Sequence, residues 1–159
     1  MATIIKEDGS EVSGANSYIS EADLATYTTD RGITLSGSQD VLILKSMDYI
    51  EVQRYIGERT TETQELEWPR KNTGIYDDDE IPEALIKAQL ALCVEIDTGN
   101  DPMAGVDRET KRESVGEVSV EYMDGARTRP SMPRVDRWLS KLTLGSTGGY
   151  LGIVGVTRG

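Results

Sequence analysis

The sequence predicts a mainly helical fold of about four helices, with a β-hairpin inserted late in the chain and an extended C-terminal tail. Two observations carry most of this prediction. From Pro82 to Gly99 the chain has a helix start signal, a run of good helix formers and a glycine stop. From Glu117 to Tyr122 polar and apolar residues alternate, which is the period of a half-exposed strand. The length of 159 residues fits one domain over residues 1–142, followed by a glycine-rich tail over residues 143–159.

Two helices are predicted before the central one. Ser20 followed by Asp23 resembles a capping box and predicts a helix that ends near Gly32. Ser38 is expected to cap a longer helix that ends before Gly57, with apolar residues at a helical period.

The segment before the central helix is expected to be short and irregular. Residues 60–66 are predicted to add one or two helical turns, which Pro69 stops. Trp68 precedes that proline, so we expect its backbone to be extended and its indole to be buried as an anchor of the loop. The run Asp77 to Glu80 is expected to lie in solvent.

The helix that begins at Pro82 is apolar around most of its circumference, which indicates a central helix contacted from several sides. Downstream, residues 109–114 can pair with residues 117–122 across a turn near Val115 and Gly116, which predicts the hairpin. Pro130 and Pro133 then lead into a short amphipathic helix with apolar positions at Val135, Trp138, Leu139 and Leu142.

The sequence lacks the residues that most catalytic mechanisms require. The chain has no histidine, which excludes imidazole catalysis and histidine metal ligands, and its one cysteine cannot make a CxxC zinc site. Cys93 lies in the central helix, where core packing is the expected role. The carboxylates from Asp77 to Glu80 lack the ligand pattern of an EF-hand loop. We therefore expect no enzyme activity, no metal and no cofactor.

Charge is divided unevenly along the chain. The net charge is −11, with −16 over residues 1–125 and +5 over residues 126–159. A single-strand binder needs a basic groove with aromatic rings for stacking. Here most aromatics (Tyr18, Tyr27, Tyr49, Tyr55 and Trp68) lie in the acidic part, whereas the basic cluster over residues 127–141 holds only Trp138. This distribution argues against DNA binding as the primary role.

Several motifs together resemble the small head–tail connector (adaptor or head-completion) proteins of tailed bacteriophages. The matching segments are Ala15-Asn16-Ser17-Tyr18-Ile19-Ser20, Met47-Asp48-Tyr49-Ile50, Leu66-Glu67-Trp68-Pro69-Arg70, Ile81-Pro82 and Val115-Gly116-Glu117-Val118-Ser119-Val120-Glu121-Tyr122. The resemblance implies a bundle of about four helices with a β-hairpin, and a structural role in a homo-oligomeric ring of twelve subunits. That ring would dock under the portal protein at the virion neck, after synthesis in the host cytoplasm. It would also contact a downstream neck or tail protein and let DNA pass through its channel without specific binding. Two alternatives stay open: a DNA-binding accessory protein, and an unrelated interaction module or carboxylate-only enzyme.

The tail from Gly145 to Gly159 is predicted to bind a partner. It holds six glycines, which make it costly to order, yet its other residues include strand-prone apolar ones. Strand addition to a partner's sheet edge, most simply the portal's, would satisfy both properties, and a frayed terminus without a role is the alternative. The predicted partner-binding residues are Arg134, Arg137, Trp138, Lys141, Tyr150, Leu151, Ile153, Val154 and Val156.

Overall fold

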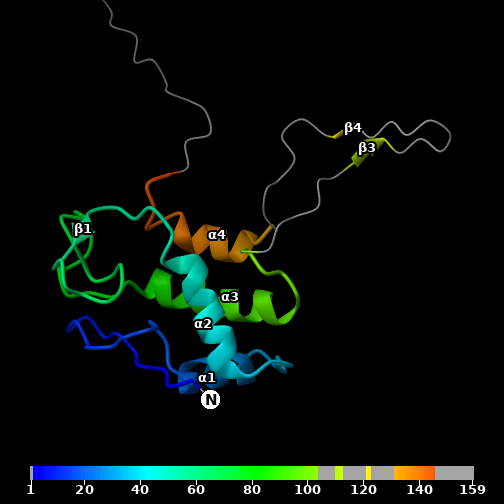
Figure 1. Cartoon of the computed structure of the whole chain (residues 1–159), viewed down its shortest axis with the longest axis horizontal. Helices are drawn as coiled ribbons and strands as arrows, with labels where there is room; N and C mark the ends of the chain where they lie inside the picture. Colours follow the sequence, from blue (N-terminus) through cyan, green and yellow to red (C-terminus); the bar gives the residue numbers. More distant parts are fainter. Residues whose placement is uncertain (1, 104–109, 113–120, 123–130, 146–159) are drawn as a thin grey trace, which may run out of the picture.

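The computed structural model of the protein describes residues 2–103, 110–112, 121–122 and 131–145. Within these residues the protein is mainly helical, with α1 (Glu21–Thr29), α2 (Gln39–Ile50), α3 (Glu83–Asp97) and α4 (Pro133–Leu139) (Figure 1). Two short antiparallel strand pairs accompany them. Strand β1 (Glu58–Arg59) pairs with β2 (Arg70–Lys71), and β3 (Thr110–Arg112) pairs with β4 (Glu121–Tyr122). The prediction of a mainly helical fold with about four helices is confirmed for the described residues.

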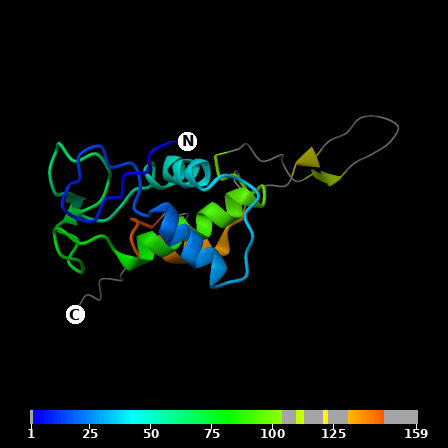
Figure 2. The ribbon, with the colours of Figure 1, turned by 90° about the horizontal axis from the view of Figure 1, so that it is seen from below.

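Helix α3 is the centre of the fold, as its apolar circumference predicts. It packs against the other three helices, and α2 crosses it on the side that faces the viewer in Figure 1. Leu85, Ala88 and Leu92 are fully buried along it. Pro82 is the N-cap residue rather than the first helical residue, and Gly99 has a φ of +94°, the left-handed conformation expected of a helix stop. Figure 2 shows the same arrangement from below, with α3 between α2 and α4.

Helix α1 begins with the predicted capping box. The backbone N–H of Asp23 donates to the Ser20 hydroxyl at 3.1 Å, and the Asp23 carboxylate accepts from the Ser20 N–H at 2.8 Å. Helix α2 begins after Ser38 as predicted, but the Ser38 hydroxyl donates to the Asp40 carboxylate instead of capping the backbone. It also ends at Ile50, several residues earlier than expected.

The chain after α2 pairs with the end of the described C-terminal segment. The N–H of Ile56 donates to the carbonyl of Leu142 at 2.9 Å, and the N–H of Leu144 donates to the carbonyl of Arg54 at 2.8 Å. These bonds replace the extra helical turn that the sequence suggested between residues 51 and 57. They also join the first residues of the predicted tail to the helical part of the protein.

The prediction of helical turns over residues 60–66 is wrong. Gln64 is buried, and its side-chain amide donates to the carbonyls of Leu66 (2.7 Å) and Pro69 (2.9 Å) while its oxygen accepts from the Thr61 N–H (2.9 Å). One side chain therefore bonds three backbone groups around a bend, and the segment forms bends instead of helical turns. Local side-chain bonds of this kind compete with helical ones.

Trp68 is the buried anchor that the sequence predicts. It is 0% exposed and meets Tyr55 and Tyr76 edge-on, with ring centroids 5.8 Å and 5.7 Å away. Its backbone N–H donates to the hydroxyl of Tyr18 at 3.1 Å, and its peptide bond to Pro69 is cis. The three rings join three segments outside the helices, around residues 55, 68 and 76.

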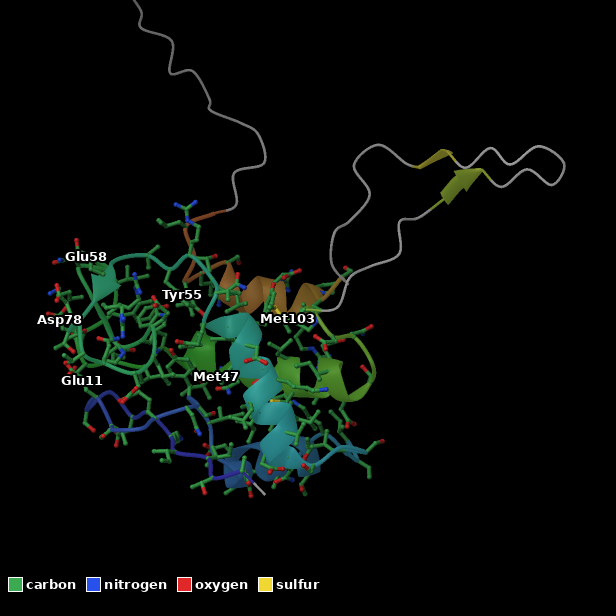
Figure 3. The ribbon with its side chains drawn as sticks, in the orientation of Figure 1. Glu11, Met47, Tyr55, Glu58, Asp78 and Met103 are labelled. Carbon is green, nitrogen blue, oxygen red and sulfur yellow. The ribbon has the colours of Figure 1, made fainter. Side chains whose placement is uncertain are left out.

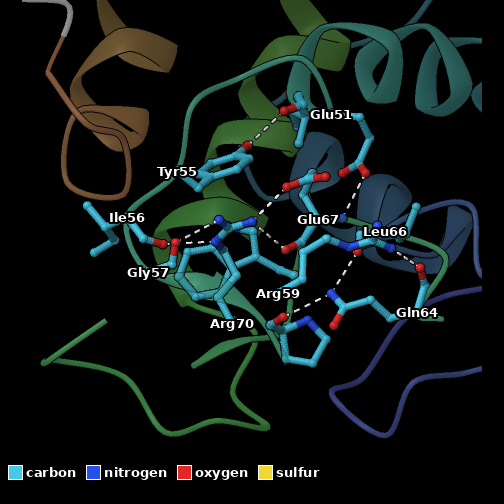
Figure 4. A network of polar contacts seen from close by, with 12 residues as sticks. Glu51, Tyr55, Ile56, Gly57, Arg59, Gln64, Leu66, Glu67 and Arg70 are labelled. Atoms are coloured by element: carbon cyan, nitrogen blue, oxygen red, sulfur yellow. Dashed lines mark hydrogen bonds and ion pairs between the residues drawn. The ribbon is translucent and has the colours of Figure 1, made fainter. Parts of the chain in front are cut away.

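A buried polar network surrounds this anchor (Figure 4). The Arg70 guanidinium donates to the Glu67 carboxylate at 2.6 Å and to the carbonyls of Ile56 and Gly57 at 2.8 and 2.9 Å. The Glu51 carboxylate accepts from the hydroxyl of Tyr18 at 2.6 Å. Burial raises the pKa of Glu51, although the Tyr18 hydrogen bond opposes that rise. Arg70 is only 8% exposed, and the cost of burying its charge is offset by its hydrogen bonds to Glu67, Ile56 and Gly57.

The antiparallel pairing of the predicted hairpin is present, with Thr110 opposite Tyr122 and Arg112 opposite Glu121. The predicted turn near Val115 and Gly116 lies outside the described residues. So does the tail beyond Gly145, with the predicted partner-binding residues Tyr150, Leu151, Ile153, Val154 and Val156. In the described residues, no helix has the length and apolar character needed to cross a membrane.

Candidate functional site

An open groove of about 1000 Å³ lies among α1, α3 and α4, and no residue of α2 lines it. Segments far apart in the sequence meet there: the end of α1 with the following turn, one residue of α3, and the outer face of α4. The lining residues combine aromatic, apolar and cationic side chains, and they are Tyr27, Arg31, Ile33, Lys87, Pro133, Arg134, Arg137 and Trp138.

Helix α4 presents its cations because its apolar residues are committed to the core. Val135 and Leu139 are buried, one helical turn apart, and so fix which face of α4 points inward. Arg134 and Arg137 are exposed on the remaining surface of α4, and Lys141 is exposed in the turn that follows the helix. Pro133 is the first residue of this helix, where its missing N–H needs no helical partner.

Trp138 stands between the core and the groove. It is half-buried and packs against the hydrophobic core, while the rest of its ring lines the groove. The Lys141 ammonium lies 4.4 Å from the ring centroid and the Lys87 ammonium 5.0 Å from it. Lys87 also pairs with the carboxylate of Glu83 at 2.7 Å. The indole is thus bordered by two flexible cations, each within cation–π range.

A second ring–cation pair borders the groove at the end of α1. The guanidinium carbon of Arg31 lies 3.7 Å from the ring centroid of Tyr27, and Arg31 donates to the carbonyl of Tyr27 at 3.2 Å. Tyr27 is half-buried because Leu24 and Thr28, on the same helix, face the core. Gly32, with a φ of +63°, then turns the chain away from α1.

The groove has a positive lining on an acidic protein. Four of the lining residues are cationic, and no acidic residue of the described part of the chain lines the groove. A fifth cation, Lys141, lies against the ring of Trp138. Of the nearby carboxylates, Glu83 is paired with Lys87, and α4 itself carries Asp136. Figure 3 shows Glu11, Glu58 and Asp78 to the left of the helices, on strand β1 (Glu58) and in the loops beside it. The acidic run Asp77–Glu80 is exposed, as predicted.

This arrangement can hold an extended polyanion that also carries flat rings. Arginine and lysine side chains neutralise phosphates, and the half-buried rings of Trp138 and Tyr27 offer stacking surfaces for bases once the cations that lie over them move to the phosphates. Single-stranded nucleic acid has both features at once, because its bases are not enclosed in a duplex. The groove therefore has the composition found in proteins that bind single strands.

The chain belongs to a known family. A family model described as "Putative DnaT-like ssDNA binding protein" matches residues 2–159. Neither a curated protein nor a solved structure matches the chain.

The family match corrects the identification suggested by the sequence motifs. The resemblance to bacteriophage head–tail connectors is wrong, and with it the structural role in a portal-docked ring. The expected portal and tail partners, and passage of DNA without specific binding, are corrected on the same ground. The location that the resemblance implied, the virion neck, is not tested by these findings.

The structure brings together part of the predicted partner-binding set. Arg134, Arg137 and Trp138 lie on α4, and Lys141 follows that helix and lies against Trp138. At the groove they are joined by Tyr27, Arg31 and Lys87, which were not among the predicted binding residues. The spacing of Tyr27 and Arg31, four residues apart, could have indicated a ring–cation pair. No sequence pattern links Lys87 to Trp138, because their contact depends on the packing of α3 against α4.

The remaining candidates from the sequence are the single cysteine and a possible metal site. Cys93 is buried as expected, and burial raises the pKa of its thiol to about 12. Within the described part of the chain, no group of three histidine, cysteine, aspartate or glutamate residues is placed to hold a metal ion.

Proposed function

We propose that the protein binds single-stranded DNA in the groove between α1, α3 and α4. The observation that carries this proposal is the meeting of two half-buried rings that line the groove, Trp138 and Tyr27, with cations from three separate helical segments. The description of the family supports the same ligand.

Binding would proceed by an exchange of partners around the rings. Lys141 and Lys87 now lie against Trp138, where an exposed cation–π contact contributes about 0.5–1 kcal/mol. When a strand enters, the ammonium groups can move to its phosphates while a base takes the face of the indole. Stacking of one base contributes about 1–3 kcal/mol, so the exchange favours the complex.

The groove favours single strands over duplexes because only unpaired bases expose their faces for stacking. A duplex would offer the same cations its phosphates alone and would lose the contribution of Trp138 and Tyr27. Base stacking on Trp138 and Tyr27 and neutralisation of phosphates by the cations both act on any base sequence. We therefore expect weak sequence preference and strong salt dependence.

We also propose that binding is not followed by catalysis. The chain contains no histidine, and the groove lining formed by the described residues contains no carboxylate to act as a general base or metal ligand. The expected role is to hold the strand.

The test is fluorescence anisotropy of a labelled oligothymidylate, compared with a duplex of equal length, at low salt. Arg134→Glu should weaken single-strand binding about tenfold, because it removes a cation and adds a like charge to the phosphates. The matched control is Arg54→Glu, which makes the same charge change at an exposed residue outside the groove lining and should have less than about twofold effect. Equal losses in both variants, or tighter binding to the duplex, would contradict the proposal.

A further inference from the structure

The outward side of α2 has the pattern of a helix seam with no partner among the described residues. Val41, Lys45, Asp48 and Val52, here called the α2 outer face, follow one another at intervals of four, three and four residues. That spacing places them on one stripe of a helix, as at the seam positions of a coiled coil. Val41 is 46% exposed and Val52 is 62% exposed. Apolar residues on a stripe are normally turned to a partner surface.

Val52 continues this stripe although α2 ends at Ile50. The backbone of Glu51 is still helical, with φ −70° and ψ −16°, and the Gln53 N–H donates to the carbonyl of Ile50 at 3.2 Å. The chain therefore follows the helical path through Val52. Figure 1 shows α2 at the front, crossing α3, with no other labelled helix or strand over its outward side.

The charges on this face are complementary to a second copy of the same face. If two α2 helices pack antiparallel about a two-fold axis, Val41 of each copy lies against Val52 of the other, and Lys45 lies against Asp48. One register thus satisfies both kinds of contact, and each kind occurs twice, as a two-fold interface requires. Within the described residues the side chains of Lys45 and Asp48 make no ion pair or hydrogen bond in their own chain.

The surface beside α2 also has a groove that can accept a side chain of the second copy. A groove of about 610 Å³ runs along the C-terminal half of the helix, and its lining includes Leu44, Met47, Asp48, Glu51, Val52 and Leu66. Val41 lies at the other end of the helix and does not line the groove. In the antiparallel arrangement the exposed Val41 of each copy reaches the mouth of the other copy's groove, beside Val52.

We propose that the α2 outer face is a self-association surface that pairs two copies of the chain through antiparallel α2 helices. This inference does not depend on the proposed function. It leaves the groove between α1, α3 and α4 open, because no residue of α2 lines that groove.

The test is sedimentation equilibrium of the full chain up to about 200 µM at low salt, the range suited to a small interface. The parent should form dimers. Val41→Glu should weaken dimerisation at least tenfold, because it places a carboxylate against Val52 and the acidic groove. The control Ile75→Glu, at a 65% exposed residue away from α2, should leave it unchanged.

Charge exchange tests the register. Lys45→Glu and Asp48→Lys should each dimerise poorly alone, because each places like charges opposite one another. Mixed together, the two variants should associate. In the mixed dimer, the carboxylate introduced at position 45 of one copy faces the ammonium introduced at position 48 of the other. Asp48 of the first copy still faces Lys45 of the second, as in the parent. A monomeric parent at about 200 µM, unchanged dimerisation in the single variants, or failure of the mixture to associate would each overturn the proposal.

Discussion

Replacing Trp68 with alanine should lower the free energy of unfolding by about 3 kcal/mol. Truncating a buried tryptophan typically costs about 3–5 kcal/mol, since the cavity is only partly refilled. At Trp68 the two edge-on contacts with Tyr55 and Tyr76 are lost as well, each contributing about 0.5–1.5 kcal/mol. Against this, the buried indole N–H has no hydrogen-bond partner among the described residues, so removing it recovers about 1–3 kcal/mol. The ring contacts and the N–H contribute similar amounts of opposite sign, so the loss stays within about 3–5 kcal/mol, and about 3 kcal/mol is its lower limit.

The assay is urea unfolding followed by circular dichroism, with thermal melting as a second measurement. For a protein of this length a loss of about 3 kcal/mol corresponds to a fall in Tm of about 6–12 °C. Ile75→Ala, at a residue that is 65% exposed, is the control and should change stability by less than about 0.5 kcal/mol. If Trp68→Ala and Ile75→Ala melt together, Trp68 does not anchor the loops and the reasoning fails.

Three further predictions concern Glu51, Lys141 and Cys93. Burial raises the pKa of Glu51 above its usual value of 4.5, so the folded state holds the proton more tightly and this group's contribution to stability falls as pH rises past 4.5. Glu51→Gln should therefore gain stability relative to the parent as the pH rises from 4.5 towards neutrality in urea titrations, and a constant difference would contradict this. Lys141→Met should reduce the slope of log Kobs against log salt for single strands by about 0.7 in anisotropy titrations, whereas an unchanged slope would place Lys141 off the phosphates. Cys93 should stay unlabelled by a thiol reagent at about pH 8 until urea unfolds the protein, and rapid labelling of the native protein would refute its burial.

Most of the helices could be predicted because their signals are local. The capping box at Ser20 and the stop at Gly99 involve residues within a few positions of each other, and the structure has both. The prediction of helical turns over residues 60–66 failed because the Gln64 side chain stabilises bends in competition with a helix, through hydrogen bonds to the carbonyls of Leu66 and Pro69. No propensity scale registers that competition.

The candidate site was harder to predict because the sequence gives the net charge of each segment, whereas the site depends on which charged residues helix packing brings together. Of the aromatic residues in the acidic part, Tyr18, Tyr49, Tyr55 and Trp68 are buried, whereas Tyr27 lines the groove. Arg31 and Lys87 also come from that acidic part, but helix packing places them beside the basic face of α4. A net charge of −11 therefore coexists with a groove that has no acidic lining residue in the described part of the chain.

The most direct measurement of the central claim is a titration of the protein's tryptophan fluorescence with an oligothymidylate. Trp68 is 0% exposed, so Trp138 is the tryptophan that a strand in the groove can reach. We predict saturable quenching that weakens with salt and disappears in Trp138→Phe, which should also bind more weakly. Tight binding of the strand without quenching of Trp138, or no binding even at low salt, would contradict the account.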